Sequence, residues 1–202
     1  HAIALIGGTG MVGRHIAQQT LDAGYRVRML VRDPTKAPAY HPLLEIVKGD
    51  ANDPAAIVES LLGCDVVINT IGGVSASEVT SSILRAMNRS GIKRYIGVTG
   101  ASLSLPNDTF DFLTAIGQGW FRLRYPRMMR DKLNEYRLLE ASQMEWTLFR
   151  LPFVKEGPVT GNVTIDLRNL PGTRITNGDI ASFLLQQLES TEYVRQAPFI
   201  SN

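Results

Sequence analysis

Short apolar runs alternate along the first half of the chain with segments of helical periodicity. The strand-like runs are nearly continuous in apolar residues, as strands buried on both faces are. They lie at 2–6, 25–31, 65–70 and 93–98. The helical segments between them lie at 12–22, 53–62 and 76–90. This strict alternation predicts a parallel sheet covered by helices on both faces.

The second half of the chain has a looser pattern. Residues 101–118 predict a long loop, and a loop of that length usually has a function. After it the sequence predicts a helix at 127–142, a strand at 145–150, a short strand at 162–167, a helix opening at Asn177 and a last strand at 197–200. We therefore expect a single α/β domain over 1–202, a Rossmann-like doubly wound parallel sheet. Within it, residues 151–202 should form a small C-terminal part that shapes a substrate pocket.

Composition and charge exclude several classes of function. The 202 residues are 44% hydrophobic and 20% charged, which is typical of one globular domain. A net charge of +2 is too small to indicate a nucleic acid or an anionic membrane, and no apolar stretch reaches the roughly 18 residues of a membrane span. The single cysteine, Cys64, excludes an internal disulfide, so we expect a cytoplasmic protein that has no signal peptide. No cluster of His, Cys and Asp has metal-ligand spacing.

Three glycines follow the first strand directly, in the sequence GGTGMVG. Gly7 permits a tight turn, Gly10 lets the backbone approach a pyrophosphate, and Gly13 lets the following helix pack closely on the strand. The N-terminus of that helix presents N–H groups and a partial positive charge to phosphates. The segment therefore predicts a dinucleotide site made of Gly7, Gly8, Thr9, Gly10, Met11, Val12 and Gly13.

The end of the second strand indicates which dinucleotide binds. A protein specific for NAD(H) usually has an acidic residue there, whereas this chain has Arg32, whose guanidinium suits a 2′-phosphate. Lys36 and Arg14 are candidate helpers. Asp33 keeps NAD(H) open as the alternative, because a shift of one residue would exchange the two roles. We favour NADP(H) over NAD(H).

Several further stretches resemble a known family. They are VKGDAND (47–53), DVVINTIGG (65–73), YIGVTGAS (95–102) and DKLNEYRLLEASQMEWTLFRLP (131–152). Together with the G-x-x-G-x-x-G spacing, they resemble the atypical short-chain dehydrogenase/reductases, in particular the NmrA-like and biliverdin-reductase-B or flavin-reductase-like proteins. The resemblance covers essentially the whole chain and implies one Rossmann domain that binds NADP(H).

The resemblance also implies roles for individual residues. Asp50 and Ala51 should lie at the adenine, and Thr99, Ser102 and Lys132 should be the catalytic residues. Thr99 and Lys132 should contact the cofactor too. The other cofactor contacts implied are Thr70, Ile71, Gly72, Gly73, Pro152 and Phe153.

The chain departs from the family in one important position. Short-chain dehydrogenases use Tyr-x-x-x-Lys, in which the tyrosine protonates an alkoxide, but Met128 stands four residues before Lys132. Tyr125 is out of register by three residues. Without that acid, a planar conjugated acceptor such as a flavin or quinone is favoured over a simple ketone, because its reduced anion is delocalised. Aromatic residues that could stack on such a ring are Phe153, Phe110, Phe112 and Trp120.

The sequence thus predicts an NADPH-dependent reductase of a small conjugated molecule, active as a monomer or homodimer. The alternative is a non-catalytic, NmrA-like NADP sensor that acts through a protein partner. A sugar-nucleotide epimerase is less favoured, because its chemistry uses the missing tyrosine and a larger substrate domain.

Overall fold

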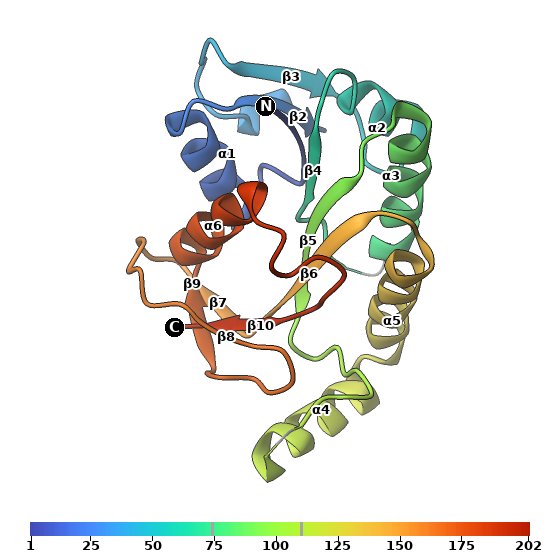
Figure 1. Ribbon diagram of the computed structural model, residues 1–202, viewed down its shortest axis with the longest axis vertical. Helices are drawn as coiled ribbons and strands as arrows, with labels where there is room; N and C mark the ends of the chain where they lie inside the picture. Colours follow the sequence, from blue (N-terminus) through green and yellow to red (C-terminus); the bar gives the residue numbers. More distant parts are fainter. Residues whose placement is uncertain (74, 110) are drawn as a thin grey trace.

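The computed structural model describes residues 1–73, 75–109 and 111–202. Within them, one mostly parallel sheet has the strand order β3-β2-β1-β4-β5-β6-β10-β8 (Figure 1). Its strands are β1 (Ala2–Ile6), β2 (Arg26–Val31), β3 (Leu44–Lys48), β4 (Val66–Asn69), β5 (Arg94–Gly100), β6 (Glu145–Leu151), β10 (Phe199–Ser201) and β8 (Thr164–Asp166). The pairing of β8 with β10 is antiparallel. The predicted Rossmann-like fold is confirmed.

Helices cover both faces of this sheet (Figure 1). α1 (Gly13–Asp22) and α6 (Asn177–Gln186) pack together, and α3 (Ala76–Ser90) packs against α2 (Pro54–Ser60) and α5 (Pro126–Ala141). Each face has its own core because side chains alternate along a strand. On β1, Ile3 and Leu5 join the core under α1 and α6, whereas Ala4 and Ile6 join the core that includes residues of α2, α3 and α5.

The structure differs from the sequence-based expectation in three places. The apolar pattern of β3 is broken by Glu45 and Lys48, which lie on opposite faces of the strand and are both exposed, because β3 is the edge strand of the sheet. A separate pair, β7 (Phe153–Lys155) with β9 (Arg174–Thr176), is too short to give a pattern. The loop predicted over 101–118 is wrong in its second half, where α4 (Phe112–Arg124) begins. Asp111 caps α4 by accepting a hydrogen bond from the N–H of Thr114 at 2.8 Å.

A buried ion pair fixes the segment that precedes α4. The guanidinium of Arg150 on β6 binds both carboxylate oxygens of Asp108, at 2.6 and 2.9 Å, and both side chains are at most 3% exposed. The same guanidinium donates to the carbonyl oxygens of Leu103, Leu167 and Ala197 at 2.7–3.2 Å. One side chain thereby joins the chain after β5 to the segments that flank β8 and β10.

Replacing Asp108 by Asn should destabilise the fold by about 3–5 kcal/mol, because it leaves a buried guanidinium without its counter-charge. Urea unfolding at neutral pH measures the loss. Glu45→Gln is the matched control: it breaks the ion pair between Glu45, which is exposed, and Arg28, and should cost less than about 1 kcal/mol. Equal losses for the two variants would contradict the anchoring role of Arg150.

Candidate functional site

The strand order reverses between β1 and β4. The chain passes from β1 through α1 to β2 on one side of β1, whereas β4 lies on its other side. In sheets of this kind, ligands bind beyond the carboxyl ends of the strands at such a reversal. The candidate site therefore lies next to Ile6 and Asn69, the last residues of β1 and β4.

The turn after β1 needs glycine at two positions. Gly7 has φ +88°, in the left-handed region, and a Cβ on it would lie 2.5 Å from Oγ1 of Thr70. A Cβ on Gly13 would lie 2.1 Å from the carbonyl oxygen of Gly7. That carbonyl oxygen also accepts a hydrogen bond from the Thr70 hydroxyl at 3.0 Å. The turn, the first residue of α1 and the end of β4 are thus in direct contact.

The middle of this turn has the features that suit a phosphate. A Cβ on Gly10 would meet only the carbonyl oxygen of Gly7, at 3.6 Å, so the space in front of Gly10 is open. The N-cap of α1 is Val12, whose aliphatic side chain can accept no hydrogen bond from the first turn. The positive end of the helix dipole is therefore not capped by a side chain and can attract an anion, although the N–H groups of Gly10, Arg14 and His15 already donate to backbone carbonyl oxygens.

A cavity of about 340 Å³ lies beside the turn. It brings together seven residues that the sequence singled out: Gly7, Thr9, Arg32, Asp50, Ala51, Ile71 and Gly72. Leu30, Gly49, Asn52, Ser75 and Val79 complete the lining. The carboxylate of Asp50 accepts a hydrogen bond from the N–H of Asn52 at 2.9 Å, and this bond is the main reason that the pKa of Asp50 is lowered.

Arg32 and Asp33 differ in what their side chains do. Arg32 lines the cavity. Asp33 caps the short 3₁₀ helix η1 (Pro34–Lys36), accepting hydrogen bonds from the hydroxyl of Thr35 at 2.7 Å and from its N–H at 3.1 Å. These two bonds lower the pKa of Asp33. Of the two residues, Arg32 is the one that lines the cavity.

The two predicted helpers of Arg32 lie elsewhere. Arg14 forms an ion pair with Glu156, which also contacts His15 and accepts a hydrogen bond from Asn177 at 2.7 Å. The bond from Asn177 is the main cause of the lowered pKa of Glu156. Lys36 lines a neighbouring cavity of about 330 Å³, together with Gly8 and Arg14.

A lysine–serine pair lies at the carboxyl end of β5. Nζ of Lys132, on α5, donates to Oγ of Ser102 at 2.9 Å, three residues beyond Thr99. Burial lowers the pKa of the Lys132 ammonium, and the charge of Glu135 opposes that shift. Met128 lies one turn before Lys132 on α5, where the tyrosine of short-chain dehydrogenases would stand. Tyr125 joins α4 to α5.

Beneath the lysine–serine pair lies a buried network that sequence reasoning missed. Thr80 donates to the carboxyl group of Glu135 at 2.8 Å, and the amide of Asn69 donates to the Tyr95 hydroxyl at 3.0 Å and to Thr80 at 3.5 Å. Oδ1 of Asn69 accepts the N–H of Ile71 at 3.0 Å. The network therefore holds the loop after β4, which lines the cavity. Its one sequence signal is Glu135, three residues after Lys132 and so on the same side of α5.

The aromatic candidates do not line this cavity. Pro152 and Phe153 lie where β6 passes into β7, and Phe153 is 74% exposed. Phe112 and Trp120 lie exposed on α4, and Phe110 is outside the described residues. Cys64 is buried, and desolvation raises its pKa to about 11, as suits an unreactive thiol. Among the described residues, no group of three His, Cys, Asp or Glu could hold a metal ion.

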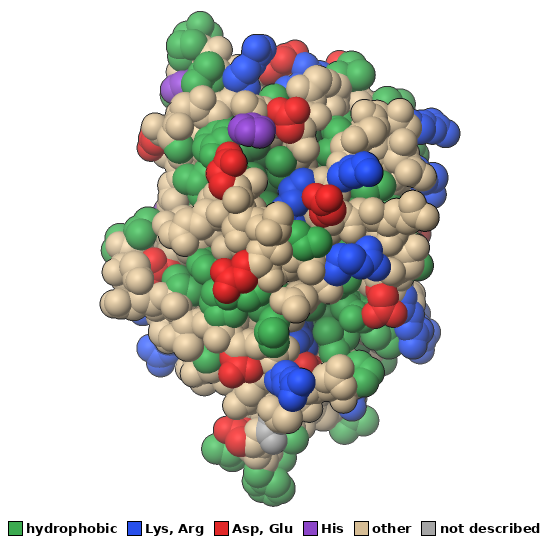
Figure 2. Space-filling model, in the orientation of Figure 1, with side chains coloured by type: hydrophobic (Ala, Val, Ile, Leu, Met, Phe, Trp, Pro, Cys, Tyr) green, Lys and Arg blue, Asp and Glu red, His purple; other side chains and the backbone are tan. Residues whose placement is uncertain are grey.

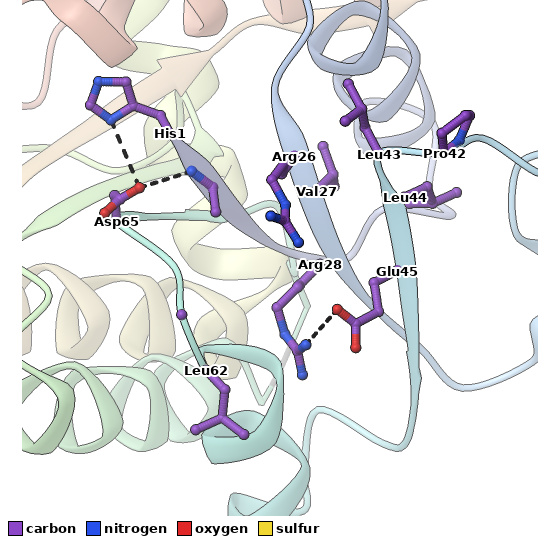
Figure 3. A pocket seen from close by; sticks show the side chains of 12 residues that line it. His1, Arg26, Val27, Arg28, Pro42, Leu43, Leu44, Glu45, Leu62 and Asp65 are labelled. Atoms are coloured by element: carbon purple, nitrogen blue, oxygen red, sulfur yellow. Dashed lines mark hydrogen bonds and ion pairs between the residues drawn. The ribbon is translucent and has the colours of Figure 1, made fainter.

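A third cavity, of about 530 Å³, lies at the opposite edge of the sheet (Figure 3). It is formed by the amino ends of β1, β2 and β3, with Arg26 and Arg28 among its lining residues. Arg28 pairs with Glu45 at 2.6 Å, and Nδ1 of His1 lies 3.8 Å from Asp65. Because doubly wound sheets bind ligands at the carboxyl ends of their strands, we do not assign this cavity to the nucleotide.

The Glu135 network makes stability depend on pH. Burial raises the pKa of Glu135 from about 4.5 to about 7, so the folded state holds the proton more tightly than the unfolded state does. The resulting stabilisation is complete below pH 4.5 and is lost as the pH rises through 7. Glu135→Gln, which stays neutral, should match the wild type at low pH and exceed its stability above pH 7, by on the order of 2–3 kcal/mol.

Urea unfolding of both proteins across this pH range measures the effect. Glu59→Gln, at an exposed carboxylate on α2, should follow the wild type throughout. A constant difference between wild type and Glu135→Gln at all pH values would show that Glu135 keeps an ordinary pKa.

Known proteins resemble this chain in sequence and in fold. A family model described as NAD(P)H-binding matches residues 7–191. The chain is 38% identical over 104 residues to phenylcoumaran benzylic ether reductase PT1 of Pinus taeda, a match that covers 46% of the chain and 33% of that protein. It is 29% identical over 202 residues to photosystem II assembly factor Ycf39 of Trieres chinensis, covering 95% of the chain and 60% of that protein. The matched regions thus span less than two thirds of either relative.

A solved structure agrees with the fold. A short-chain dehydrogenase/reductase of Veillonella parvula, in complex with NADP, aligns with a TM-score of 0.87 at 17% identity, covering all of this chain and 94% of that one. The resemblance to the atypical short-chain dehydrogenase/reductases that the motifs predict is confirmed. With the family match extending from the glycine turn to beyond α6, the chain belongs to the NAD(P)H-binding family of Rossmann-fold proteins.

Proposed function

We propose that this protein is an NADPH-dependent reductase whose acceptor is planar and conjugated, such as a flavin or a quinone. The observation that carries the proposal is the lysine–serine pair, Lys132 with Ser102, on a helix that has Met128 in the position of the usual tyrosine acid. The reductase named among the relatives supports hydride transfer as the reaction class.

The cofactor preference rests on the end of β2. Arg32 lines the cavity, while the carboxylate of Asp33 accepts two hydrogen bonds from Thr35. A guanidinium can bind a 2′-phosphate through two parallel hydrogen bonds, and a carboxylate would repel it. The glycine turn would hold the pyrophosphate, with Asp50 and Ala51 at the adenine. The loop Thr70–Gly73 would lie along the dinucleotide, which supplies a hydride when bound.

The acceptor class follows from the proton that each reduction needs. A ketone becomes a strongly basic alkoxide, which must be protonated as it forms, and a positioned acid usually contributes 10²–10⁴-fold to such a step. A reduced flavin or quinone spreads its negative charge over the ring system, so water can protonate it. With methionine in the position of the acid, the site is suited to the second reaction.

The remaining polar groups at the site would bind the acceptor and orient it toward the cofactor. Nζ of Lys132 donates a hydrogen bond to Oγ of Ser102, so the serine O–H can itself donate to an acceptor oxygen or nitrogen. The ammonium supplies positive charge where negative charge develops during reduction. In this proposal Thr99, near the end of β5, would contact the nicotinamide, and the exposed ring of Phe153, outside the cavity, would stack on the acceptor.

Arg32→Ala should weaken NADPH binding by roughly 1.5–3 kcal/mol, the value of hydrogen bonds to a charged group, and leave NADH binding nearly unchanged. Titration calorimetry with both nucleotides measures the two losses. Arg26→Ala, at the amino end of the same strand, is the control and should change neither affinity. If Arg32→Ala weakened both cofactors equally, Arg32 would not be reading the 2′-phosphate.

Steady-state NADPH oxidation with menadione, FMN and a panel of simple ketones tests the acceptor class. Menadione or FMN should be reduced, and the ketones should be poor substrates. Met128→Phe should leave menadione reduction within about a few-fold, whereas Met128→Tyr, its matched partner, should add ketone reduction by restoring the acid. Strong ketone reduction by the wild type, with negligible menadione and FMN activity, would overturn the proposal. NADPH binding with no turnover of any acceptor would favour the non-catalytic sensor instead.

A further inference from the structure

Helix α4 exposes the apolar side chains that a helix of a globular domain normally buries. Gln118 is its only buried side chain, whereas Leu113 is 78% exposed, Trp120 55% and Leu123 86%. The helix extends from one end of the molecule, beyond the carboxyl end of β5 (Figure 1). Hydrophobic side chains accordingly gather at that end of the surface (Figure 2). A surface of this kind marks an interaction site.

The exposed apolar residues share one face of α4. At 3.6 residues per turn, Leu113, Ile116, Trp120 and Leu123 all point within about 40° of the direction opposite to Gln118. Gln118 fixes the inner face: its amide donates to the carbonyl oxygen of Ala101 at 3.0 Å, and its Oε1 accepts from the hydroxyl of Ser104. These four residues, called here the apolar stripe, are therefore directed away from the body of the protein.

Charge on the same segment is of one sign. Residues 112–130 contain four arginines, Arg122, Arg124, Arg127 and Arg130, and no acidic residue. All four side chains are exposed, while the next acidic residue, Asp131, is buried and bonded to Ser77. The net charge of +2 for the whole chain conceals this cluster, because acidic residues elsewhere offset it.

We propose that α4 binds an anionic membrane surface, with the apolar stripe inserted at the headgroup boundary and the arginines on the lipid phosphates. An aliphatic stripe that includes a tryptophan, flanked by arginine, is the composition of helices that lie in this interface. Thirteen residues of helix, about 20 Å, would lie along the bilayer and not across it. Consistently, no helix among the described residues is long and apolar enough to traverse a bilayer.

A second copy of the chain fits this surface less well. Joining two apolar stripes would bring eight arginines together with the two Asp111 side chains that cap the helices, and most of the positive charge would remain without an acidic partner. An anionic lipid surface satisfies both features at once. This proposal differs from the expectation, drawn from net charge, that the protein has no membrane partner. Gln118 of α4 donates a hydrogen bond to the carbonyl oxygen of Ala101, the residue before Ser102. A membrane bound to α4 would therefore lie near the lysine–serine pair.

Vesicle flotation and tryptophan fluorescence test the proposal on the full chain. Trp120 is exposed and the second tryptophan, Trp146, is buried, so insertion should shift the emission to shorter wavelength. We expect flotation and the shift with vesicles containing about one-third phosphatidylglycerol, and neither with phosphatidylcholine alone. Trp120→Phe should float but lose the shift.

Two sets of variants separate the apolar and the charged contributions. Leu113→Gln combined with Ile116→Gln should abolish flotation, and Leu62→Gln combined with Tyr40→Gln, at exposed apolar residues elsewhere, should not. Arg124→Gln combined with Arg127→Gln should weaken binding roughly 30-fold, and Arg168→Gln combined with Arg174→Gln should leave it unchanged. Absence of vesicle binding, or binding indifferent to lipid charge, would overturn the proposal. So would a stable dimer in ultracentrifugation that the Leu113 and Ile116 changes dissociate, because a second copy would then cover the stripe.

Discussion

The carbonyl oxygen of Gly7 lies so close to Gly13 that no side chain fits between helix α1 and the turn behind β1. This contact sets the position of α1, and with it the direction in which the first-turn amides and the helix dipole point. The carbonyl oxygen of Gly7 also accepts a hydrogen bond from the Thr70 hydroxyl, so this one atom contacts both the start of α1 and the residue that follows β4. Oδ1 of Asn69 accepts a hydrogen bond from the N–H of Ile71. This bond fixes the start of the loop that lines the cavity. The geometry of the candidate nucleotide site thus depends on one close approach between backbone segments.

Helix α5 links that nucleotide site to the proposed chemistry. Along its length, Asp131 bonds Ser77 at the start of α3, Lys132 bonds Ser102 after β5, and Glu135 bonds Thr80. The hydroxyl of Thr80 in turn accepts a hydrogen bond from the side-chain amide of Asn69. A helix that carries the cationic group of the site is therefore held by the same network as the loop after β4. For this reason, the protonation of Glu135 bears on the stability of the region that should hold the cofactor.

Much of this arrangement could be predicted from the sequence, because it depends on local patterns. The continuous apolar runs of β1 and β4, the helical spacing of α3 and the glycine turn each follow from one physical rule that acts over a few residues. Edge strand β3 could not be found in this way, since Glu45 and Lys48 face solvent. The partners of Arg150 and Glu135 also could not, because each pairs with residues more than forty positions away. Helix α4 was missed because its apolar residues face outward, where the usual rule expects polar ones.

A dinucleotide bound at the carboxyl edge of the sheet, between β1 and β4, would change the surroundings of a defined set of backbone amides. Amide chemical shifts of ¹⁵N-labelled protein, titrated with NADP⁺, measure this residue by residue. The perturbed amides should cluster in the glycine turn at 7–13, at Arg32, at Asp50 and Ala51, and in the loop 70–73. Perturbations confined to the amino ends of the strands, around Arg26, Arg28 and Asp65, would contradict this placement of the dinucleotide, as would the absence of any shift at saturating nucleotide.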